Sequence, residues 1–303
     1  GISVMSAPSD PQKALREFPR RHDFFIGIDS DGCAFDTMEV KHKECFIPNI
    51  IEAYELAAIS KYVREAAEFV NLYSHWRGIN RFPALVMAFD LAMNRPEVAA
   101  RRFKLPALKG VRAWIQRETK LSNPMLKAEV AATNDADLAL ALKWSEAVNE
   151  TVGRIVHDVP PFPFVRESLQ CLQDKADVMV VSATPGEALD REWEENGIKP
   201  YVGLIAGQEL GSKKEHLALA AVGKYDQNKI LMIGDAPGDM KAAFDNGVLF
   251  YPIDPGHEDE SWQRFFEEAL PKFLNGEFAG AYMAAQVARF EALLPKTPPW
   301  QTA

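Results

Sequence analysis

The sequence feature that most constrains the fold is a set of short β-rich runs, the first of which stands far from the others. Residues 24–29 (FFIGID) form an apolar run that ends in an acidic residue, as a buried parallel strand does. Four more runs follow late in the chain, at residues 177–182, 201–206, 229–234 and 248–252. Amphipathic segments and glycine-containing turns separate these later runs. Strands that alternate with helices predict a parallel sheet with helices on both of its faces.

The residues between the first run and the others have the spacing of helices. Within residues 60–73 the apolar positions Val63, Ala66 and Val70 fall three or four apart. A chain of 303 residues also has room for about two domains, at roughly 150 residues each. We therefore expect an α/β domain at residues 1–36 and 161–257, an inserted all-helical domain at 37–160, and a helical C-terminal extension at 258–303 that packs on the α/β domain.

Composition and charge exclude several classes of protein. The formal net charge of −9 would repel nucleic-acid backbones and anionic lipids. No uninterrupted apolar stretch approaches the roughly 20 residues needed to cross a bilayer. The three cysteines, Cys33, Cys45 and Cys171, form no Cys-x-x-Cys pair, which disfavours a disulfide framework or structural zinc site and favours a reducing compartment. We expect a cytoplasmic protein without nucleic-acid or membrane partners, and no signal indicates its oligomeric state.

Polar residues follow several of the predicted strands at the point where each strand ends. In open α/β sheets, ligands bind beyond the carboxyl ends of the strands. The residues at these ends are Asp29 and Asp31 in GIDSDG, Ser182 and Thr184 in VVSATPG, and Asp235 and Asp239 in GDAPGD. Upstream of the GDAPGD strand, Lys213 and Lys214 open an amphipathic segment. These strand ends are the candidate functional site.

Four aspartates at one edge of a sheet repel one another unless a cation lies among them. Ligands that are oxygen atoms only suit a hard ion, and a site that shares its ligands with phosphate suits Mg²⁺. The spacing of Asp29 and Asp31 lets both side chains point the same way from an extended backbone. With a metal ion and a lysine nearby, one carboxylate can attack an electrophile, and the other can serve as a general acid.

The four motifs, in this order, resemble those of the haloacid dehalogenase superfamily of hydrolases. GIDSDG at residues 27–32 is similar to the first motif, although Cys33 stands where the family usually has threonine. Ser182 is similar to the second motif, and GDAPGD at residues 234–239 to the fourth. Lys213 or Lys214 fills the third, and we prefer Lys213 because Leu217 follows it at the family spacing. The resemblance implies a Rossmann-like α/β core with a helical cap inserted between the first and second motifs.

The resemblance also implies a role for each motif residue. Asp29 would attack a phosphoryl group and form an aspartyl-phosphate, while Asp31 would protonate the leaving group and then activate water. Ser182 would donate a hydrogen bond to a phosphoryl oxygen, and Lys213 would neutralise charge there. Mg²⁺ would be bound by Asp29, the backbone carbonyl of Asp31 and Asp235, with Asp239 either a direct ligand or a residue just behind the ligands.

The expected activity is a Mg²⁺-dependent phosphatase acting on a small phosphorylated metabolite, with sugar phosphates the first class to test. The presence of Asp31 argues against the dehalogenase and phosphonate-cleaving branches, which lack this aspartate. A phosphomutase of the same superfamily and a non-catalytic metabolite-binding member remain as alternatives. Candidate substrate contacts in the insertion are Arg77, Asn80, Arg81 and His42.

Overall fold

The computed structural model describes residues 10–301, and these residues form two compact units. We call residues 10–36 and 158–290 the core unit, and residues 37–157 and 291–301 the helical unit. Each unit is described separately below. No helix among the described residues is both long enough and apolar enough to span a membrane.

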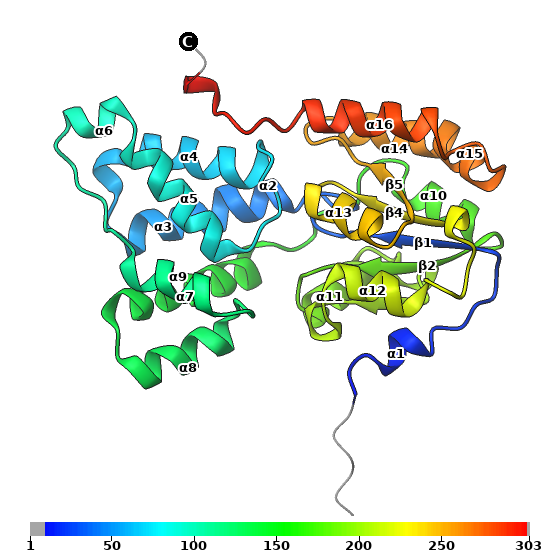
Figure 1. The fold of residues 1–303 in the computed structure, drawn as a ribbon, viewed down its shortest axis with the longest axis horizontal. Helices are drawn as coiled ribbons and strands as arrows, with labels where there is room; N and C mark the ends of the chain where they lie inside the picture. Colours follow the sequence, from blue (N-terminus) through cyan, green and yellow to red (C-terminus); the bar gives the residue numbers. More distant parts are fainter. Residues whose placement is uncertain (1–9, 302–303) are drawn as a thin grey trace, which may run out of the picture. The chain divides into compact units, whose positions relative to one another are not determined.

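The core unit is built around a five-stranded parallel sheet with strand order β3-β2-β1-β4-β5 (Figure 1). The strands are β1 (Phe24–Ile28), β2 (Ala176–Val181), β3 (Leu204–Ala206), β4 (Ile230–Gly234) and β5 (Leu249–Pro252). In β1, Ile28 pairs with Val180 on one side and with Ile233 on the other. Because β1 is central, the first run of the sequence joins two halves of the sheet. The predicted α/β fold class is confirmed.

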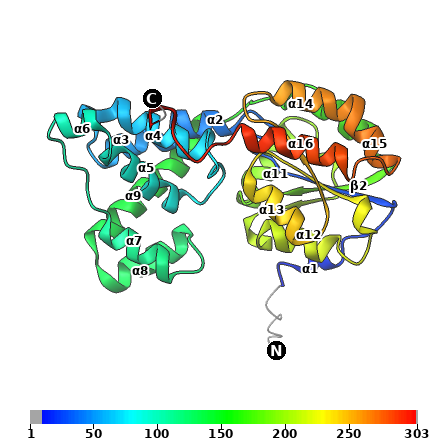
Figure 2. The same cartoon turned by 45° about the horizontal axis from the view of Figure 1, so that its top comes forward.

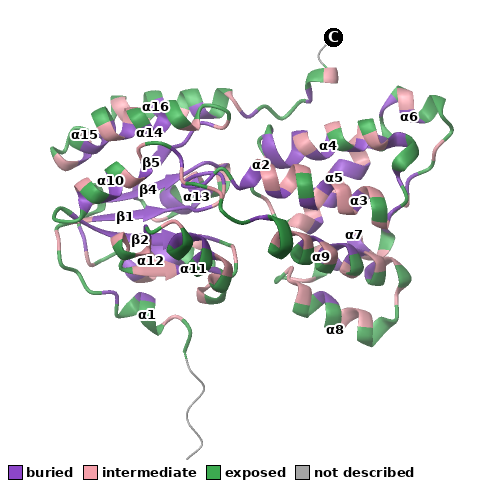
Figure 3. Ribbon diagram, turned by 180° about the vertical axis from the view of Figure 1, so that it is seen from behind, coloured by how far each residue is buried: buried purple, intermediate pink, exposed green. Residues whose placement is uncertain are grey.

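Helices cover both faces of this sheet. Successive strand residues point to opposite faces, and apolar residues on each face need to be covered. On one face, Ile26 and Ile28 belong to an apolar cluster with Leu169, Trp262 and Phe265, which lie on α10 (Val165–Leu172), α14 (Glu258–Arg264) and η6 (Phe265–Ala269). On the other face, α12 (Lys213–Ala220) approaches so closely that a side chain at Gly27 would touch Leu217. Strands β1, β2, β4 and β5 are largely buried, as the colouring of Figure 3 shows, whereas Leu204 and Ile205 of the edge strand β3 are half-buried.

The helices of the core unit follow the strands in alternation. Their bounds are α1 (Lys13–Arg16), α10 (Val165–Leu172), α11 (Gly186–Glu195), η3 (Lys199–Tyr201), η4 (Gln208–Leu210), α12 (Lys213–Ala220), η5 (Gln227–Lys229), α13 (Pro237–Asp245), α14 (Glu258–Arg264), η6 (Phe265–Ala269), α15 (Leu270–Leu274) and α16 (Ala281–Ala292). The predicted strand at 201–206 is shorter than expected, since it starts at Leu204 after the 3₁₀ turn η3, in which Pro200 fixes the backbone.

The described part of the helical unit contains helices and no strand (Figure 2). Its elements are α2 (Met38–Lys41), η1 (His42–Phe46), α3 (Ile47–Ala53), η2 (Ala57–Ile59), α4 (Ser60–Leu72), α5 (Arg81–Met93), α6 (Pro96–Ala100), α7 (Lys109–Arg117), α8 (Asn123–Thr133), α9 (Ala136–Ile155) and η7 (Pro299–Gln301). Aromatic side chains form its centre, where the Phe82 ring lies 5.2 Å from Trp114 and 6.1 Å from Trp144.

The end of the chain differs from the expected C-terminal extension. Helices α14 and α15 pack on the core as expected, but residues 291–301 belong to the helical unit. The reason is an aromatic anchor: the Trp300 ring lies 5.8 Å from Phe69 and 4.6 Å from the guanidinium of Arg95. The backbone N–H of His75 also donates to the carbonyl of Pro295 at 3.0 Å. The extension is therefore divided between the two units.

Candidate functional site

The candidate site lies where the order of the strands reverses. The chain runs from β1 outward through β2 and β3, and then returns to the other side of β1 with β4 and β5. Where the connections that follow two neighbouring strands lead to opposite sides of the sheet, an open crevice remains for a ligand beyond the carboxyl ends of those strands. Asp29 follows β1 directly and Asp235 follows β4 directly. The two predicted motifs therefore meet at the switch point.

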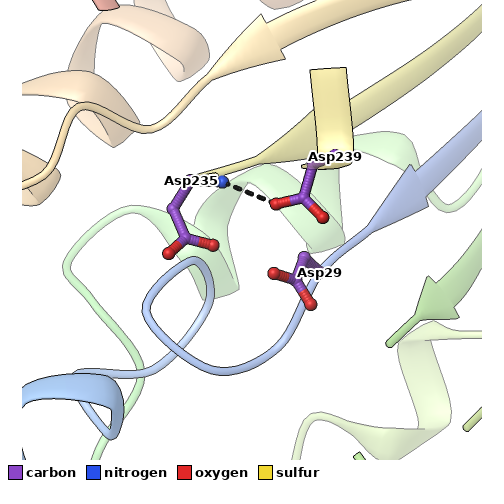
Figure 4. Close-up of side chains that lie close together, drawn as sticks. All are labelled: Asp29, Asp235 and Asp239. Carbon is purple, nitrogen blue, oxygen red and sulfur yellow. Dashed lines mark hydrogen bonds between the residues drawn. The ribbon is translucent and has the colours of Figure 1, made fainter. Parts of the chain in front are cut away.

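Three buried carboxylates converge at this point from two segments that lie far apart in the sequence (Figure 4). One oxygen from each of Asp29, Asp235 and Asp239 lies within 4.8 Å of the other two. This is the one group of three such side chains with metal-ligand spacing among residues 10–301. Three negative charges at this spacing require positive charge between or beside them.

Asp239 is held by the first turn of α13. One of its carboxylate oxygens, Oδ2, accepts hydrogen bonds from the backbone N–H groups of Asp235 and Ala236, each at 3.1 Å. Gly234 makes this approach possible, because a Cβ there would lie only 2.4 Å from the Cβ of Asp239. Asp239 is thus saturated on one oxygen by the backbone, which leaves Asp29 and Asp235 as the better direct ligands of a cation.

Lys213 supplies positive charge beside the carboxylates. Its Nζ lies 2.5 Å from Asp239 Oδ1 and 3.4 Å from Asp29 Oδ2. Ser212 and Glu215 form a capping box, in which each side chain accepts a hydrogen bond from the other's backbone N–H. This cap fixes Lys213 as the first residue of α12. Burial alone would lower the pKa of Lys213, but the charges of Asp239 and Asp29 hold the pKa above its ordinary value.

Lys214, the alternative for the third motif, points elsewhere. Its ammonium lies 3.9 Å from Asp245, and its side chain is 59% exposed. Adjacent helical residues project about 100° apart, so only one of the two lysines can reach the carboxylates. Of the two, Lys213 lies at the site.

Burial raises the pKa of Asp29 well above its ordinary value, and the charges of Asp239 and Asp235 raise it further, against the opposing effect of Lys213. Asp29 is only 5% exposed. Three acidic side chains thus face one lysine, which leaves the site short of positive charge. The donor set, oxygen atoms from buried carboxylates without histidine or thiolate, fits Mg²⁺.

Asp31 projects from a tight turn that follows Asp29. The backbone N–H groups of Cys33, Ala34 and Phe35 all donate to the carbonyl of Ser30, and Gly32 takes a left-handed conformation with φ of 75°. Two buried tryptophans support the turn: Trp193 donates to the Ser30 hydroxyl at 3.0 Å, and Trp262 donates to the Cys33 carbonyl at 2.7 Å. No sequence pattern indicated these supports, since both tryptophans lie far away in the chain.

Ser182 follows β2 and is 2% exposed, at the same edge of the sheet as Asp29. Its hydroxyl accepts a hydrogen bond from the backbone N–H of Thr184 at 3.1 Å. The Thr184 hydroxyl in turn donates to Asp31 Oδ2 at 2.8 Å. Thr184 was noticed in the sequence as a polar strand-end residue, but nothing there pointed to its contact with Asp31.

Two of the candidate substrate contacts have structural partners inside the helical unit. Arg77 is buried and donates to the Leu72 carbonyl at 2.9 Å. Asn80 caps α5 by accepting from the N–H of Phe82, and it donates to the carbonyl of Leu121, both at 2.9 Å. These contacts account for much of their polarity, and their role toward substrate stays a prediction.

The other two candidates, His42 and Arg81, both pack against the aromatic ring of Phe46. The rings of His42 and Phe46 stack with their centres 4.5 Å apart, and the Arg81 guanidinium lies 4.8 Å from the centre of the Phe46 ring. Arg81 Nη1 donates to the hydroxyl of Ser145 at 3.0 Å and to Asn149 Oδ1 at 2.9 Å. These partners orient the guanidinium without neutralising it.

Comparison with known families finds one similarity. A model of the haloacid dehalogenase-like hydrolase family matches residues 115–252, a little under half of the chain. This range includes Ser182, Lys213 and the GDAPGD motif, and the structure adds Asp29 beside them at the end of β1. The chain is similar to haloacid dehalogenase-like hydrolases over these residues, and this similarity supports an enzyme of the hydrolase class.

Comparison with solved structures finds similar folds at low sequence identity. A protein from Lactobacillus delbrueckii subsp. bulgaricus, named a "putative phosphoglycolate phosphatase", is 14% identical with a TM-score of 0.50, over 84% of this chain and 98% of that one. A haloacid dehalogenase-like family protein from Streptococcus pneumoniae is 13% identical, with a TM-score of 0.42 over 79% of this chain and 90% of that one. The first likeness shows a common fold. No curated protein matches the sequence.

Proposed function

We propose that this hydrolase is a Mg²⁺-dependent phosphatase that releases phosphate from a small phosphorylated metabolite through a phosphorylated Asp29. The observation that carries the proposal is the convergence of Asp29, Asp235 and Asp239 around Lys213 at the switch point of the sheet. Phosphoryl transfer needs mainly alignment of the reacting atoms and stabilisation of charge on the equatorial oxygens.

The first step is the attack of an Asp29 carboxylate oxygen on phosphorus. The bond from Asp29 to phosphorus forms while the bond from phosphorus to the leaving oxygen breaks. Mg²⁺ would be held by Asp29, Asp235 and the backbone carbonyl of Asp31, and it would supply stabilisation of charge on the phosphoryl oxygens. Lys213 adds a second positive charge, and the Ser182 hydroxyl donates to a phosphoryl oxygen.

Asp31 handles the proton in both steps. In the first step it gives its proton to the leaving oxygen, which departs as an alcohol. In the second step it takes a proton from the water that attacks the phosphorylated Asp29, and phosphate and free Asp29 result. Asp31 is partly exposed and stands on a separate turn from Asp29, which suits a group that must meet both a substrate and a water molecule.

The helical unit is proposed to act as the cap that covers substrate and excludes water. Among its candidate residues Arg81 suits an anionic or polar group of the substrate best, because no acidic side chain in residues 10–301 pairs with it. Burial lowers the pKa of Arg81 to about 10, which still leaves it charged at neutral pH. His42, Arg77 and Asn80 are weaker candidates for substrate contacts.

A panel of monophosphates tests the proposal. The panel contains sugar phosphates and phosphoglycolate, and released phosphate is measured with Mg²⁺ and with a chelator. We expect release that requires Mg²⁺ and falls by at least about 10⁴-fold in Asp29→Asn, because the nucleophile is lost. Turnover without any divalent ion would contradict the mechanism. Isomerised product without phosphate release would indicate the phosphomutase alternative, and binding without turnover the non-catalytic one.

A further inference from the structure

The hydrogen bond from the Thr184 hydroxyl to Asp31 Oδ2 connects the proposed acid to a residue that has no role in the proposed mechanism so far. The two residues are 153 positions apart in the chain, and the 2.8 Å bond joins the turn after β1 to the loop after β2. The turn fixes the backbone of Asp31 through three bonds to the Ser30 carbonyl. These bonds leave the direction of the carboxylate to its side-chain contacts.

Thr184 is itself held from both sides. Its N–H donates to the Ser182 hydroxyl at 3.1 Å, and its carbonyl accepts from the N–H of Gln208 at 2.9 Å. At Gly207 a Cβ would lie 2.7 Å from the Thr184 carbonyl oxygen, so the two loops touch without room for a side chain. The N–H of Gly186 also donates to Glu209 Oε2 at 2.9 Å.

These contacts make Thr184 a rigid point of attachment. Its hydroxyl group sits on a backbone that the β3–α12 connection braces, and Lys213 begins the helix after that connection. A hydroxyl held in this way can fix a carboxylate's orientation, because one oxygen is occupied by the donor and the plane of the group is set. A methyl or hydrogen in its place would remove this hydrogen bond from Asp31 Oδ2.

We propose that Thr184 is a positioning residue for Asp31. The Thr184 hydroxyl holds Asp31 Oδ2, so that Asp31 Oδ1 exchanges the proton with the substrate. In the first step the proton passes from Oδ1 to the leaving oxygen as the bond to phosphorus breaks. In the second step Oδ1 takes a proton from the attacking water. This inference rests on the proposed phosphatase function and adds to it the residue that aims the acid.

The test compares Thr184→Val, which keeps the shape and loses the hydroxyl, with Thr184→Ser, which keeps the hydroxyl. Two substrates are used: an alkyl phosphate that the wild-type enzyme accepts, and p-nitrophenyl phosphate, whose leaving group departs without a proton. The quantity measured is kcat/KM, because it reports steps up to phosphoryl transfer and excludes hydrolysis of phosphorylated Asp29. Thr151→Val in the helical unit is the matched control.

We expect Thr184→Val to lower kcat/KM for the alkyl phosphate by about 10²-fold and for p-nitrophenyl phosphate by less than about threefold, since general-acid catalysis contributes to the first alone. Thr184→Ser should restore most of the loss. The ratio of the two values does not depend on how much of the variant is folded. Equal losses on both substrates, or no loss, would overturn the inference. No release by the wild-type enzyme from any ester would overturn the proposed function itself.

Discussion

The core unit and the helical unit treat buried charge in opposite ways. At the edge of the sheet, three buried aspartates face the single cation of Lys213. In the helical unit the buried charge is the single cation of Arg95, which lies 2.8 Å from Glu65 and 3.2 Å from Glu97, and these two acids are 38% and 44% exposed. A single buried cation with partly exposed acidic partners needs no ligand, whereas an excess of buried like charge is tolerated only where a ligand completes it. The imbalance marks the sheet edge as the functional part.

The largest effect is expected when the one cation of the sheet edge is removed. Lys213→Met should lower kcat/KM for the best phosphate ester by about a thousandfold, because an electrostatic contact to the reacting group is lost. The comparison becomes sharper with Lys214→Met, whose ammonium is solvent-exposed near Asp245. Phosphate-release assays on both variants measure the difference. Similar losses of kcat/KM in the two variants would contradict a specific role for Lys213 in the reaction.

Mg²⁺ should stabilise the sheet edge by completing its charge. At a concentration 100 times its Kd, bound Mg²⁺ is expected to add about 2.7 kcal/mol to the free energy of unfolding. Thermal unfolding with and without Mg²⁺ measures this gain, which Asp235→Asn should abolish. Arg95→Met should lower stability by removing the cation that Glu65 and Glu97 share, yet it should keep the full gain from Mg²⁺. A gain lost in Arg95→Met and kept in Asp235→Asn would reverse the comparison.

A smaller effect is expected at the opposite end of the sheet, where Asp177 is a buried carboxylate with partners of its own. Tyr225 donates to it at 2.6 Å, and the N–H of Arg21 donates to it at 2.8 Å. Burial alone would raise the pKa of Asp177, but these hydrogen bonds hold it below its ordinary value. The carboxylate therefore stabilises the fold above the unfolded pKa of about 3.9, and this contribution is lost as the pH falls through the lower folded pKa.

Asp177→Asn should accordingly cost about 1–3 kcal/mol at pH 7, because donors that served a carboxylate then face an amide. The difference in the free energy of unfolding between wild type and Asp177→Asn should become smaller as the pH falls below about 4. Unfolding midpoints from pH 3 to pH 7 measure it. Asp174→Asn, with a side chain that is 82% exposed, is the matched control and should change little. A difference in the free energy of unfolding that does not vary with pH would contradict the lowered pKa of Asp177 in the folded protein.

The parts of the fold that follow from local pattern were predictable from the sequence. The apolar run before Asp29 and the later strand–helix alternation gave the parallel sheet, and shared sheet edges placed Asp29 beside Asp235. The choice between Lys213 and Lys214 needed the helical phase, which the Ser212 cap sets. The roles of the site residues remain predictions until variants are assayed.

Contacts between side chains that lie far apart in the sequence could not be predicted, because no local sequence pattern encodes them. The bond from Thr184 to Asp31 joins loops whose approach depends on the packing of Gly207. The packing of Trp300 on Phe69 depends on where the last helix ends, and no local pattern encodes that position. Such contacts follow from tertiary packing, which propensity and periodicity do not describe.

The return of residues 291–301 to the helical unit affects the order in which the protein can be completed. During synthesis, residues 37–157 leave the ribosome before most of the sheet exists, but Trp300 follows only after α16 has been made. Until then the ring of Phe69 and the guanidinium of Arg95 lack their contact with the Trp300 ring. The helical bundle, although translated early, is therefore finished last, after the strands and helices whose sequence interrupts it.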